Sequence, residues 1–433
     1  MTVAQLSEWL LDARCKGYPA SAPACRAADI AGRGWNLLAG DLPFPLAVLK
    51  RSALAHNLAW MQDFAQRKGV LLAPHGKTTM SPELFAMQLA AGAWGLTFAS
   101  AFQAGVGVAA GARRIIIANQ VVCDADLDTL DALLSRHADL HLCFLVDSLA
   151  QLALLQDWRQ RRGSARVFDV LLEVGVPGQR TGCRSLAQAQ ALAQAIAVSS
   201  AARLVGIECY EGSAAQCDSA QDSQAVTELL RRTLEVARYC DSAGLWAAPE
   251  AIGPHILLTA GGSAVFDLVL PLLRTSGLTR PVAGVLRSGC YLTHDHGNYH
   301  RYLQLLQQRQ GLDASLRPAL SVWAMVQSVP EPGLALLTCG RRDISYDLEM
   351  PMPVTLVRRG RRDRQSLPPD WRITALNDQH AYLRCAPEAG PQPEVGDLVE
   401  LGISHPCTTF DKWRWLPLVE DDGSITGAVR TFF

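Results

Sequence analysis

Short hydrophobic runs and helical stretches alternate along the middle of this chain. From about residue 70, β-prone runs are separated by segments whose apolar positions recur at helical spacing. The eight runs are Val70–Ala73, Gly95–Ala99, Arg114–Ala118, His141–Val146, Val167–Val174, Leu204–Tyr210, His255–Ala260 and Ala283–Leu286. Strands that alternate with helices every ~30 residues are expected to be parallel and joined by crossover helices.

Seven helical segments lie between these runs, and an eighth, Ser52–Gln66, precedes them. The seven are Pro82–Leu89, Ser100–Ala109, Ala125–Ser135, Leu149–Arg161, Leu186–Val198, Gln224–Cys240 and Ser263–Leu273. Two of them end in the phrase Ala-Ala-Gly-Ala, in which the glycine is a helix C-cap signal. Eight strands favour a closed (β/α)8 barrel of the TIM type, and an open doubly wound sheet is the alternative.

The pattern changes after about residue 312. Strand-like stretches then follow one another closely, separated by prolines, glycines and polar turns: Leu320–Ser328, Ala335–Cys339, Pro353–Val357, His380–Arg384 and Asp397–Leu401. We therefore expect three parts: an N-terminal leader over residues 1–45, a barrel over 46–311, and a C-terminal all-β domain over 312–433. The leader is expected to join the β domain in part, because an early strand at Pro45–Leu49 precedes the barrel and can pair there.

Charge and composition exclude some partners and add little else. The 433 residues contain 40 Lys and Arg against 41 Asp and Glu, and no cluster of positive charge that nucleic acid or an anionic membrane would require. No apolar run approaches the ~20 residues that span a bilayer. Residues Met1–Leu11 do not read as a secretory signal, and the twelve cysteines read as reduced thiols, so we expect a cytoplasmic protein.

The first chemical signal is a lysine directly after the first run. The run ends in Pro74-His75-Gly76-Lys77-Thr78, and the next helix begins with Ser81 as its N-cap and Pro82 at its first position. Lys77 would thus lie at the carboxyl end of a barrel strand, where such barrels carry their chemistry. A desolvated lysine amine loses its proton more easily and can form a Schiff base with a carbonyl cofactor. A surface lysine in a loop is the alternative.

Glycines follow the seventh and eighth runs. The two segments are Thr259-Ala260-Gly261-Gly262-Ser263, which is expected to open a helix, and Arg287-Ser288-Gly289-Cys290-Tyr291. Glycine lets backbone N–H groups approach an anion, and these two loops of a barrel often bind phosphate. Tight turns would also explain each pair of glycines. Together with Lys77, however, a phosphate anchor indicates pyridoxal 5′-phosphate, with the lysine on the aldehyde and the loops on the phosphate.

A second signal lies near the C-terminus, at His405-Pro406-Cys407. Two residues apart, His405 and Cys407 can point to one side of an extended segment, and imidazole and thiolate both suit zinc. The alternative is a buried cysteine beside a hydrogen-bonded histidine. Two ligands also fall short of the three usual in catalytic zinc sites, so water or substrate would complete the shell. Three further histidines are either extra ligands or polar loop residues at the barrel mouth: His294, His296 and His300.

Seven motifs occur in a defined order along the chain. They are Pro74-His75-Gly76-Lys77-Thr78, Glu173-Val174-Gly175, Gln179-Arg180-Thr181-Gly182, Tyr210-Glu211-Gly212, Gly261-Gly262-Ser263, Arg287-Ser288-Gly289 and His405-Pro406-Cys407. As a set they resemble the D-serine dehydratase and D-threonine aldolase group, which belongs to the alanine racemase-like (fold type III) pyridoxal phosphate enzymes. The resemblance extends from about Pro45 to Thr409 and is weak from Arg358 to Asp370.

The resemblance implies a role for each matching position. Lys77 would hold the cofactor covalently, and His405 with Cys407 would bind zinc. Arg180 would lie near the phenolic oxygen of the cofactor, while Arg287, or else Tyr210, would face its pyridine nitrogen. The residues implied around the phosphate are Gly261, Gly262, Ser263, Gly289 and Cys290. Two positions depart from the family: Gly76 replaces a larger residue, and Ser288 stands where proline is common.

The resemblance also implies the reaction. We expect a dehydratase (ammonia-lyase) that eliminates water from a small D-3-hydroxy amino acid such as D-serine, giving a keto acid and ammonia. Lys77 would remove the α-proton, and zinc would act as a Lewis acid on the β-hydroxyl. A D-threonine aldolase is the nearest alternative, an amino-acid racemase the second, and a non-enzymatic cofactor carrier the last. Proteins of this group are often homodimers, so a homodimer is expected.

Overall fold

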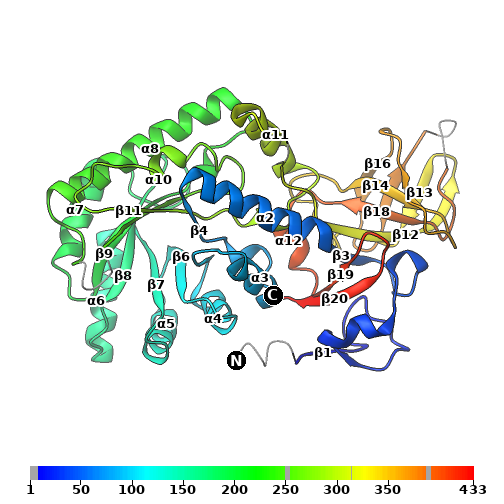
Figure 1. The fold of residues 1–433 in the computed structure, drawn as a ribbon, viewed down its shortest axis with the longest axis horizontal. Coiled ribbons are helices and arrows are strands. Elements are labelled where there is room, and N and C mark those ends of the chain that lie inside the picture. The colour runs from blue at the N-terminus through cyan, green and yellow to red at the C-terminus, as the bar shows by residue number, and fades with distance from the viewer. Residues whose placement is uncertain (1–7, 249–253, 314, 387–391) are drawn as a thin grey trace.

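Two bodies of secondary structure make up the molecule. The computed structural model describes residues 8–248, 254–313, 315–386 and 392–433. A parallel barrel with helices around it lies beside a separate antiparallel β domain, and the leader folds against that β domain (Figure 1). The predicted fold class, a (β/α)8 barrel with an all-β domain, is confirmed.

The barrel is built from eight parallel strands in the order β4-β11-β10-β9-β8-β7-β6-β5. Their bounds are β4 Leu71–Leu72, β5 Leu96–Phe98, β6 Arg114–Gln120, β7 His141–Val146, β8 Phe168–Val174, β9 Ala202–Cys209, β10 Ile256–Ala260 and β11 Val282–Leu286. The backbone bonds Trp94 N–Leu72 O at 2.8 Å and Thr97 N–Pro74 O at 2.9 Å join the two end strands. Each predicted run therefore contains a strand.

Helices surround the strands and begin where the sequence provides caps. Their bounds are α2 Arg51–Lys68, α3 Pro82–Ala90, α4 Ala101–Ala109, α5 Asp124–Arg136, α6 Leu149–Arg162, α7 Leu186–Ala197, α8 Ser219–Ser242, α10 Leu270–Leu273 and α11 Asn298–Gln310. Ser148 caps α6 through the backbone N–H of Gln151, and Ser185 forms a capping box with Gln188 in α7. Gly163 ends α6 in a left-handed conformation.

Two helix predictions were wrong. The segment expected to be helical over Ser263–Leu273 is helical only over Leu270–Leu273; the residues before it form turns. Val265, Phe266 and Val269 are all buried, so this segment does not have the one-sided apolar stripe of a surface helix. In addition, α11 was missed, and it places His300 in a helix rather than in a loop.

The β domain is a ten-stranded antiparallel sheet with one parallel pair. Its bounds are β3 Leu46–Lys50, β12 Leu320–Glu331, β13 Leu334–Leu337, β14 Met352–Val357, β15 Gln365–Ser366, β16 Arg372–Leu376, β17 Ala381–Arg384, β18 Leu398–Gly402, β19 Trp415–Val419 and β20 Ile425–Arg430. The early strand β3 pairs with β12 and β19, so it belongs to this sheet and not to the barrel strands, although the predicted barrel range began at residue 46. The leader adds a two-stranded sheet of β1 (Leu10–Leu11) and β2 (Cys25–Arg26).

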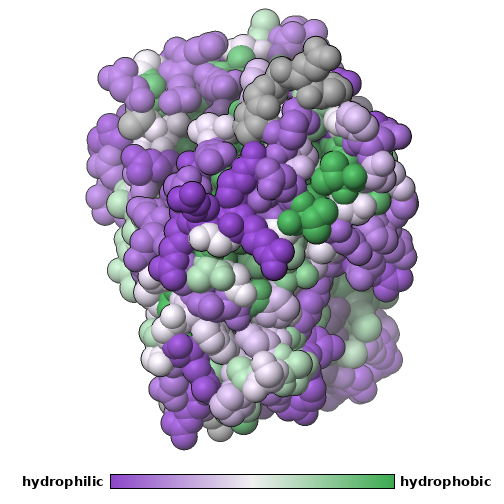
Figure 2. Space-filling model, turned by 90° about the vertical axis from the view of Figure 1, so that its right-hand side faces the viewer, coloured by the Kyte–Doolittle hydropathy of each residue, from purple (hydrophilic) through white to green (hydrophobic). Residues whose placement is uncertain are grey.

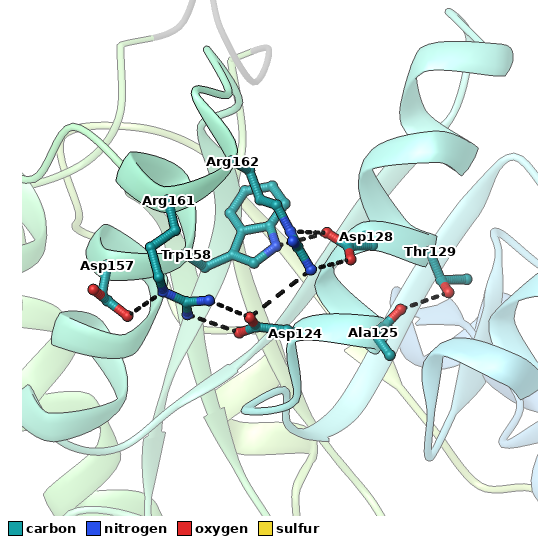
Figure 3. Close-up of polar contacts among 8 residues, drawn as sticks. All are labelled: Asp124, Ala125, Asp128, Thr129, Asp157, Trp158, Arg161 and Arg162. Atoms are coloured by element: carbon teal, nitrogen blue, oxygen red, sulfur yellow. Dashed lines mark hydrogen bonds and ion pairs between the residues drawn. The ribbon is translucent and has the colours of Figure 1, made fainter.

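The outer helices α5 and α6 are joined by charged groups at the surface. Arg161 binds Asp124 of the neighbouring helix and Asp157 of its own, and Arg162 binds Asp128 at 2.7 Å (Figure 3). All of these side chains are at least one-third exposed. Such pairs orient neighbouring helices and add little stability each.

The molecule presents a mostly polar surface on the side of the β domain. Figure 2 views this end face, which is largely hydrophilic apart from one compact hydrophobic group. Within the described residues, no helix is long and apolar enough to cross a lipid bilayer.

Candidate active site

The loop that carries Lys77 is tied to the barrel on both sides. His75 N donates to Arg287 O at 3.1 Å, and residues Gly76–Thr78 then form one 3-10 turn before α3. Lys77 is exposed, so the burial expected for its amine is not found in this structure, and it lines a cavity at the carboxyl ends of the strands. A Cβ at position 76 would lie 2.5 Å from the ring of Phe98 and 2.9 Å from that of Phe85. The departure at Gly76 therefore reflects packing behind the lysine.

One cavity brings together every predicted site residue. Its volume is about 450 Å³, within the range of small-molecule and cofactor pockets. The predicted residues that line it are Lys77, Arg180, Tyr210, Gly261, Gly262, Ser263, Arg287, Gly289, Cys290, His405 and Cys407. The strand ends supply most of this wall, and the β domain supplies the last two.

The two glycine loops face each other across this cavity. Ser288 Oγ donates to Gly262 O at 2.7 Å, and Cys290 N donates to Ser263 Oγ at 3.0 Å. A Cβ on Gly289 would lie 2.4 Å from His75 O, so only glycine allows this loop to approach the lysine loop. Ser288 thus has a function where proline would have none, because its hydroxyl joins the two loops.

A buried carboxylate occupies part of the expected phosphate cradle. Glu211 accepts hydrogen bonds from Gly261 N at 2.9 Å and from Gly262 N at 2.5 Å. Burial raises the pKa of Glu211. Since α10 begins only at Leu270, no helix N-terminus points at this loop either. In this arrangement Glu211 occupies the amides of Gly261 and Gly262, and Ser263 and Gly289 remain as candidate anion-binding residues on the same cavity.

Arg287 forms a buried ion pair below the cavity. Its guanidinium donates to Thr259 Oγ1 at 2.8 Å, to Cys209 O at 3.3 Å and to Glu208. The two side chains are only 3% and 1% exposed. Burial raises the pKa of Glu208 to about 8, an effect that the neighbouring arginine partly offsets. Glu208 was missed by the sequence analysis.

Arg180 and Tyr210 lie together on another wall. The Arg180 guanidinium is 4.2 Å from the centre of the Tyr210 ring, a cation–π distance. Burial raises the pKa of Tyr210 to about 12, so its hydroxyl is protonated near neutral pH. Nearby, Glu173 accepts hydrogen bonds from Gln120 at 2.5 Å and from Thr181 at 2.9 Å. Thr181 belongs to the same motif as Arg180, so Glu173 fixes the loop that carries the arginine.

The proposed metal ligands come from the segment after β18. His405 Nδ1 lies 2.6 Å from Asp347 Oδ2, which leaves Nε2 for a ligand. The pKa of the Cys407 thiol is lowered to about 7, mainly by a hydrogen bond from Cys290. In the ranges that the structure describes, no three or more His, Cys, Asp and Glu side chains are grouped as a metal ion would require.

The three other histidines do not line the cavity. His294 is buried and His296 is half-buried, and desolvation lowers their pKa to about 3 and about 4. One ring nitrogen of each of the three has no hydrogen-bond partner among the described residues. The remaining polar residues of the cavity, to which the sequence analysis gave no role, are His75, Thr78, Asn119, Glu173, Thr181, Glu208 and Tyr299. The signal available for the two glutamates was their position at the ends of predicted strands.

Two family models match the chain. The model of the alanine racemase N-terminal domain covers residues 49–252, which include the barrel strands β4 to β9. The model of a putative serine dehydratase domain covers residues 319–419, which is most of the β domain.

Several known proteins resemble the chain over most of its length. It is 29% identical to a D-threonine aldolase of an Arthrobacter species over 87% of this chain and 89% of that protein. It is 27% identical to the D-threo-3-hydroxyaspartate dehydratase of Delftia sp. (strain HT23), over 89% of this chain and 96% of that protein. The crystal structure of D-threonine aldolase from Filomicrobium marinum superimposes with a TM-score of 0.74 at 24% identity, covering 92% and 97% of the two chains, which shows a shared fold.

Fold, cavity and family models agree on one class. The chain belongs to the alanine racemase-like, fold type III class of pyridoxal phosphate enzymes. Within that class it is a lyase of the D-serine dehydratase and D-threonine aldolase group. The cofactor of the class fits this cavity, since a lysine, two close glycine loops and an arginine converge there.

Proposed function

We propose that this lyase is a zinc-dependent dehydratase of D-3-hydroxy amino acids, converting a substrate like D-serine to a keto acid and ammonia. One observation carries the proposal: Lys77 and the pair His405 and Cys407 line the same cavity of about 450 Å³ although they come from different domains. A base and a soft-metal site on one small cavity are what removal of an α-proton and loss of a β-hydroxyl require.

The cofactor would be held by the groups that line the cavity. Lys77 would bind its aldehyde carbon, and Ser263 with the loop of Gly289 would bind its phosphate. Arg287 lies at the floor, where it would face the ring nitrogen. When bound, pyridoxal 5′-phosphate supplies a conjugated ring that withdraws electrons from the α-carbon of an amino acid.

Lys77 is also the proposed base. Its Nζ amine, at the cavity wall, would accept the α-proton of the substrate. Arg180, exposed at the rim and held over Tyr210, would lie near the phenolic oxygen of the cofactor.

His405 and Cys407 are the proposed metal ligands. His405 presents Nε2 because Nδ1 is bonded to Asp347, a carboxylate–histidine arrangement common around metals. A zinc ion held there would polarise the β-hydroxyl of the substrate and make it a better leaving group. The imidazole and thiolate donors suit this metal.

A D-threonine aldolase is the second candidate. The same cavity would serve it, since loss of the proton from the β-hydroxyl of the substrate would promote cleavage of Cα–Cβ. The chain is similar to a named D-threonine aldolase and to a named dehydratase at 29% and 27% identity, so similarity alone does not separate the two.

Product analysis tests the proposal. The purified enzyme with pyridoxal 5′-phosphate would be given D-serine, D-threonine and 3-hydroxy-D-aspartate in turn, with and without a chelator. Keto acid and ammonia indicate the dehydratase, and glycine with an aldehyde indicates the aldolase. Conversion between D- and L-amino acids, with neither product, would instead indicate a racemase and contradict the proposal.

The metal part has its own control. The chelated enzyme should recover its activity with Zn²⁺, whereas His405→Ala should not recover under the same conditions. Activity that is indifferent to the chelator would remove zinc from the proposal and leave the lyase assignment intact. The homodimer and the cytoplasmic location remain predictions.

A further inference from the structure

Cys290 and Cys407 bring two sulfur atoms together inside the cavity. Their Sγ atoms are 3.9 Å apart, although the residues are separated by 117 positions in the chain. One follows barrel strand β11 and the other begins the short helix α12 (Cys407–Phe410) after β18. Thr78, next to Lys77, has its Oγ1 3.6 Å from the first sulfur and 3.4 Å from the second. The thiol pair thus lies beside the lysine that would hold the cofactor.

The spacing of the two sulfurs suits a shared metal ion. In a tetrahedral zinc site, Zn–S bonds of about 2.3 Å place two thiolate sulfurs about 3.8 Å apart. The sulfurs of Cys290 and Cys407 are at 3.9 Å without a bond between them. A plain S–H···S hydrogen bond is the competing account of this distance, since either thiol can donate to the other.

The backbone and the side chain of Cys290 contact different parts of the cavity wall. Its N–H donates to Ser263 Oγ in the glycine loops, while its sulfur points to the opposite side, toward Cys407. Cys290 is buried, at 4% exposure. The residue therefore connects the phosphate side of the cavity to the metal side.

We propose that Cys290 is a third protein ligand of the metal ion held by His405 and Cys407. This rests on the metal part of the proposed function. The set becomes two thiolates and one imidazole, the three protein ligands usual for catalytic zinc, and leaves one position for the substrate hydroxyl. Because the described residues do not already form a three-ligand group, binding requires a side-chain adjustment within this set.

X-ray absorption at the zinc edge tests the proposal on the unmodified enzyme. The enzyme loaded with pyridoxal 5′-phosphate and one equivalent of Zn²⁺ should show two sulfur scatterers at about 2.3 Å. One sulfur scatterer would overturn the proposal and restore the hydrogen-bond account. Failure to bind Zn²⁺ would overturn it together with the metal part of the proposed function.

Substitution gives a second, independent measurement. Replacing Zn²⁺ by Co²⁺ produces charge-transfer absorbance that grows with the number of thiolates bound. Cys290→Ser should lose about half of this absorbance and weaken Co²⁺ binding by more than the ~10–100-fold typical of losing an outer-shell partner. Cys240→Ser is the matched control, because that thiol is equally buried but lies in α8 outside the cavity. Full absorbance in Cys290→Ser would overturn the proposal.

These outcomes separate the inference from the function. Two sulfurs on zinc in an enzyme that forms neither keto acid nor aldehyde would support the ligand set and contradict the proposed reaction. An active, zinc-dependent enzyme with a single sulfur ligand would support the proposed reaction and contradict the ligand set.

Discussion

The barrel has a cavity at each end, and the larger one is not the candidate active site. The cavity at the amino ends of the strands has a volume of about 760 Å³, against about 450 Å³ at the carboxyl ends. Both contain charged side chains: the larger one is lined by Arg114, His141 and Asp169 among others. Volume and charge alone would therefore select the wrong end.

The two cavities differ in the chain segments that line them. The amino-end cavity is lined by the starts of strands and the residues just before them, and its charged groups are held by neighbours: Arg114 lies over the Trp94 ring at 5.6 Å, and Asp169 pairs with Arg203. The carboxyl-end cavity receives glycine loops, an exposed lysine and two donors from another domain. Convergence of separate segments on one small volume marks the site, as expected for this class of barrel.

Replacing one cationic residue at each end would test this contrast most strongly. Lys77→Ala should abolish the absorbance of the covalently held cofactor and lower lyase turnover by at least ~10²–10⁴-fold, since it removes the base. Arg114→Ala, at the other end, should leave turnover within about twofold. A persistent absorbance band in Lys77→Ala would show that another group holds the cofactor.

The ion pairs of the two ends should contribute differently to the free energy of unfolding. Arg287 and Glu208 are 3% and 1% exposed, whereas Arg203 and Asp169 are 36% and 17% exposed. At pH 9, where Glu208 is ionised in the native chain, Arg287→Ala should lower the free energy of unfolding by about 3–5 kcal/mol, because the buried carboxyl must then either stay charged without a partner or take up a proton. Arg203→Ala should cost about 1–2 kcal/mol. Urea unfolding of the cofactor-free proteins measures both.

A double variant serves as the control for that comparison. In Arg287→Met with Glu208→Leu, both charges are removed, so most of the lost stability should return. If the double variant is as unstable as Arg287→Ala, the loss comes from packing and not from the unpaired carboxylate.

The pH dependence of stability should also reveal Glu208. Burial raises its pKa to about 8, above the usual carboxyl value, so the folded state holds a proton that the unfolded state has released. Its contribution is therefore complete at low pH and is lost as pH rises toward 8, with a limiting slope of about 1.4 kcal/mol per pH unit. Unfolding curves between pH 5 and pH 9 should show this fall in the native chain and less of it in Glu208→Gln. Parallel curves would contradict the assignment.

More of the barrel than of the candidate site could be predicted from the sequence. All eight barrel strands were predictable, because short β-prone runs, helical spacing and C-cap glycines such as Gly92 and Gly111 recur together. The Ser263–Leu273 helix was predicted too long: glycine followed by serine is a local signal for a helix start, but the chain forms turns up to Leu270. Helix α11 was missed because its sequence is mostly polar, with few apolar positions to reveal the period.

The polar contacts inside the site join residues that are far apart in the sequence, so no local sequence pattern reveals them. Glu211 binds amides 50 and 51 positions away, and Glu208 binds an arginine 79 positions away. The sulfur of Cys290 meets that of Cys407 across 117 positions. Motifs could indicate Lys77, His405 and the glycine loops one by one, but only the folded chain brings in the partners that set their chemistry.

Removing an ion pair between the outer helices α5 and α6 should change the free energy of unfolding least of all the substitutions considered. Arg161 contacts Asp124 and Asp157, but its side chain is 46% exposed and its partners 37% and 57% (Figure 3). Water and salt screen such pairs, so Arg161→Ala should lower the free energy of unfolding by no more than about 1 kcal/mol. The same measurement in 1 M salt should reduce that difference further. Arg161 forms two ion pairs and Arg287 forms one. If Arg161→Ala lowered the free energy of unfolding as much as Arg287→Ala, the number of charged contacts, and not their burial, would determine how much they stabilise this fold.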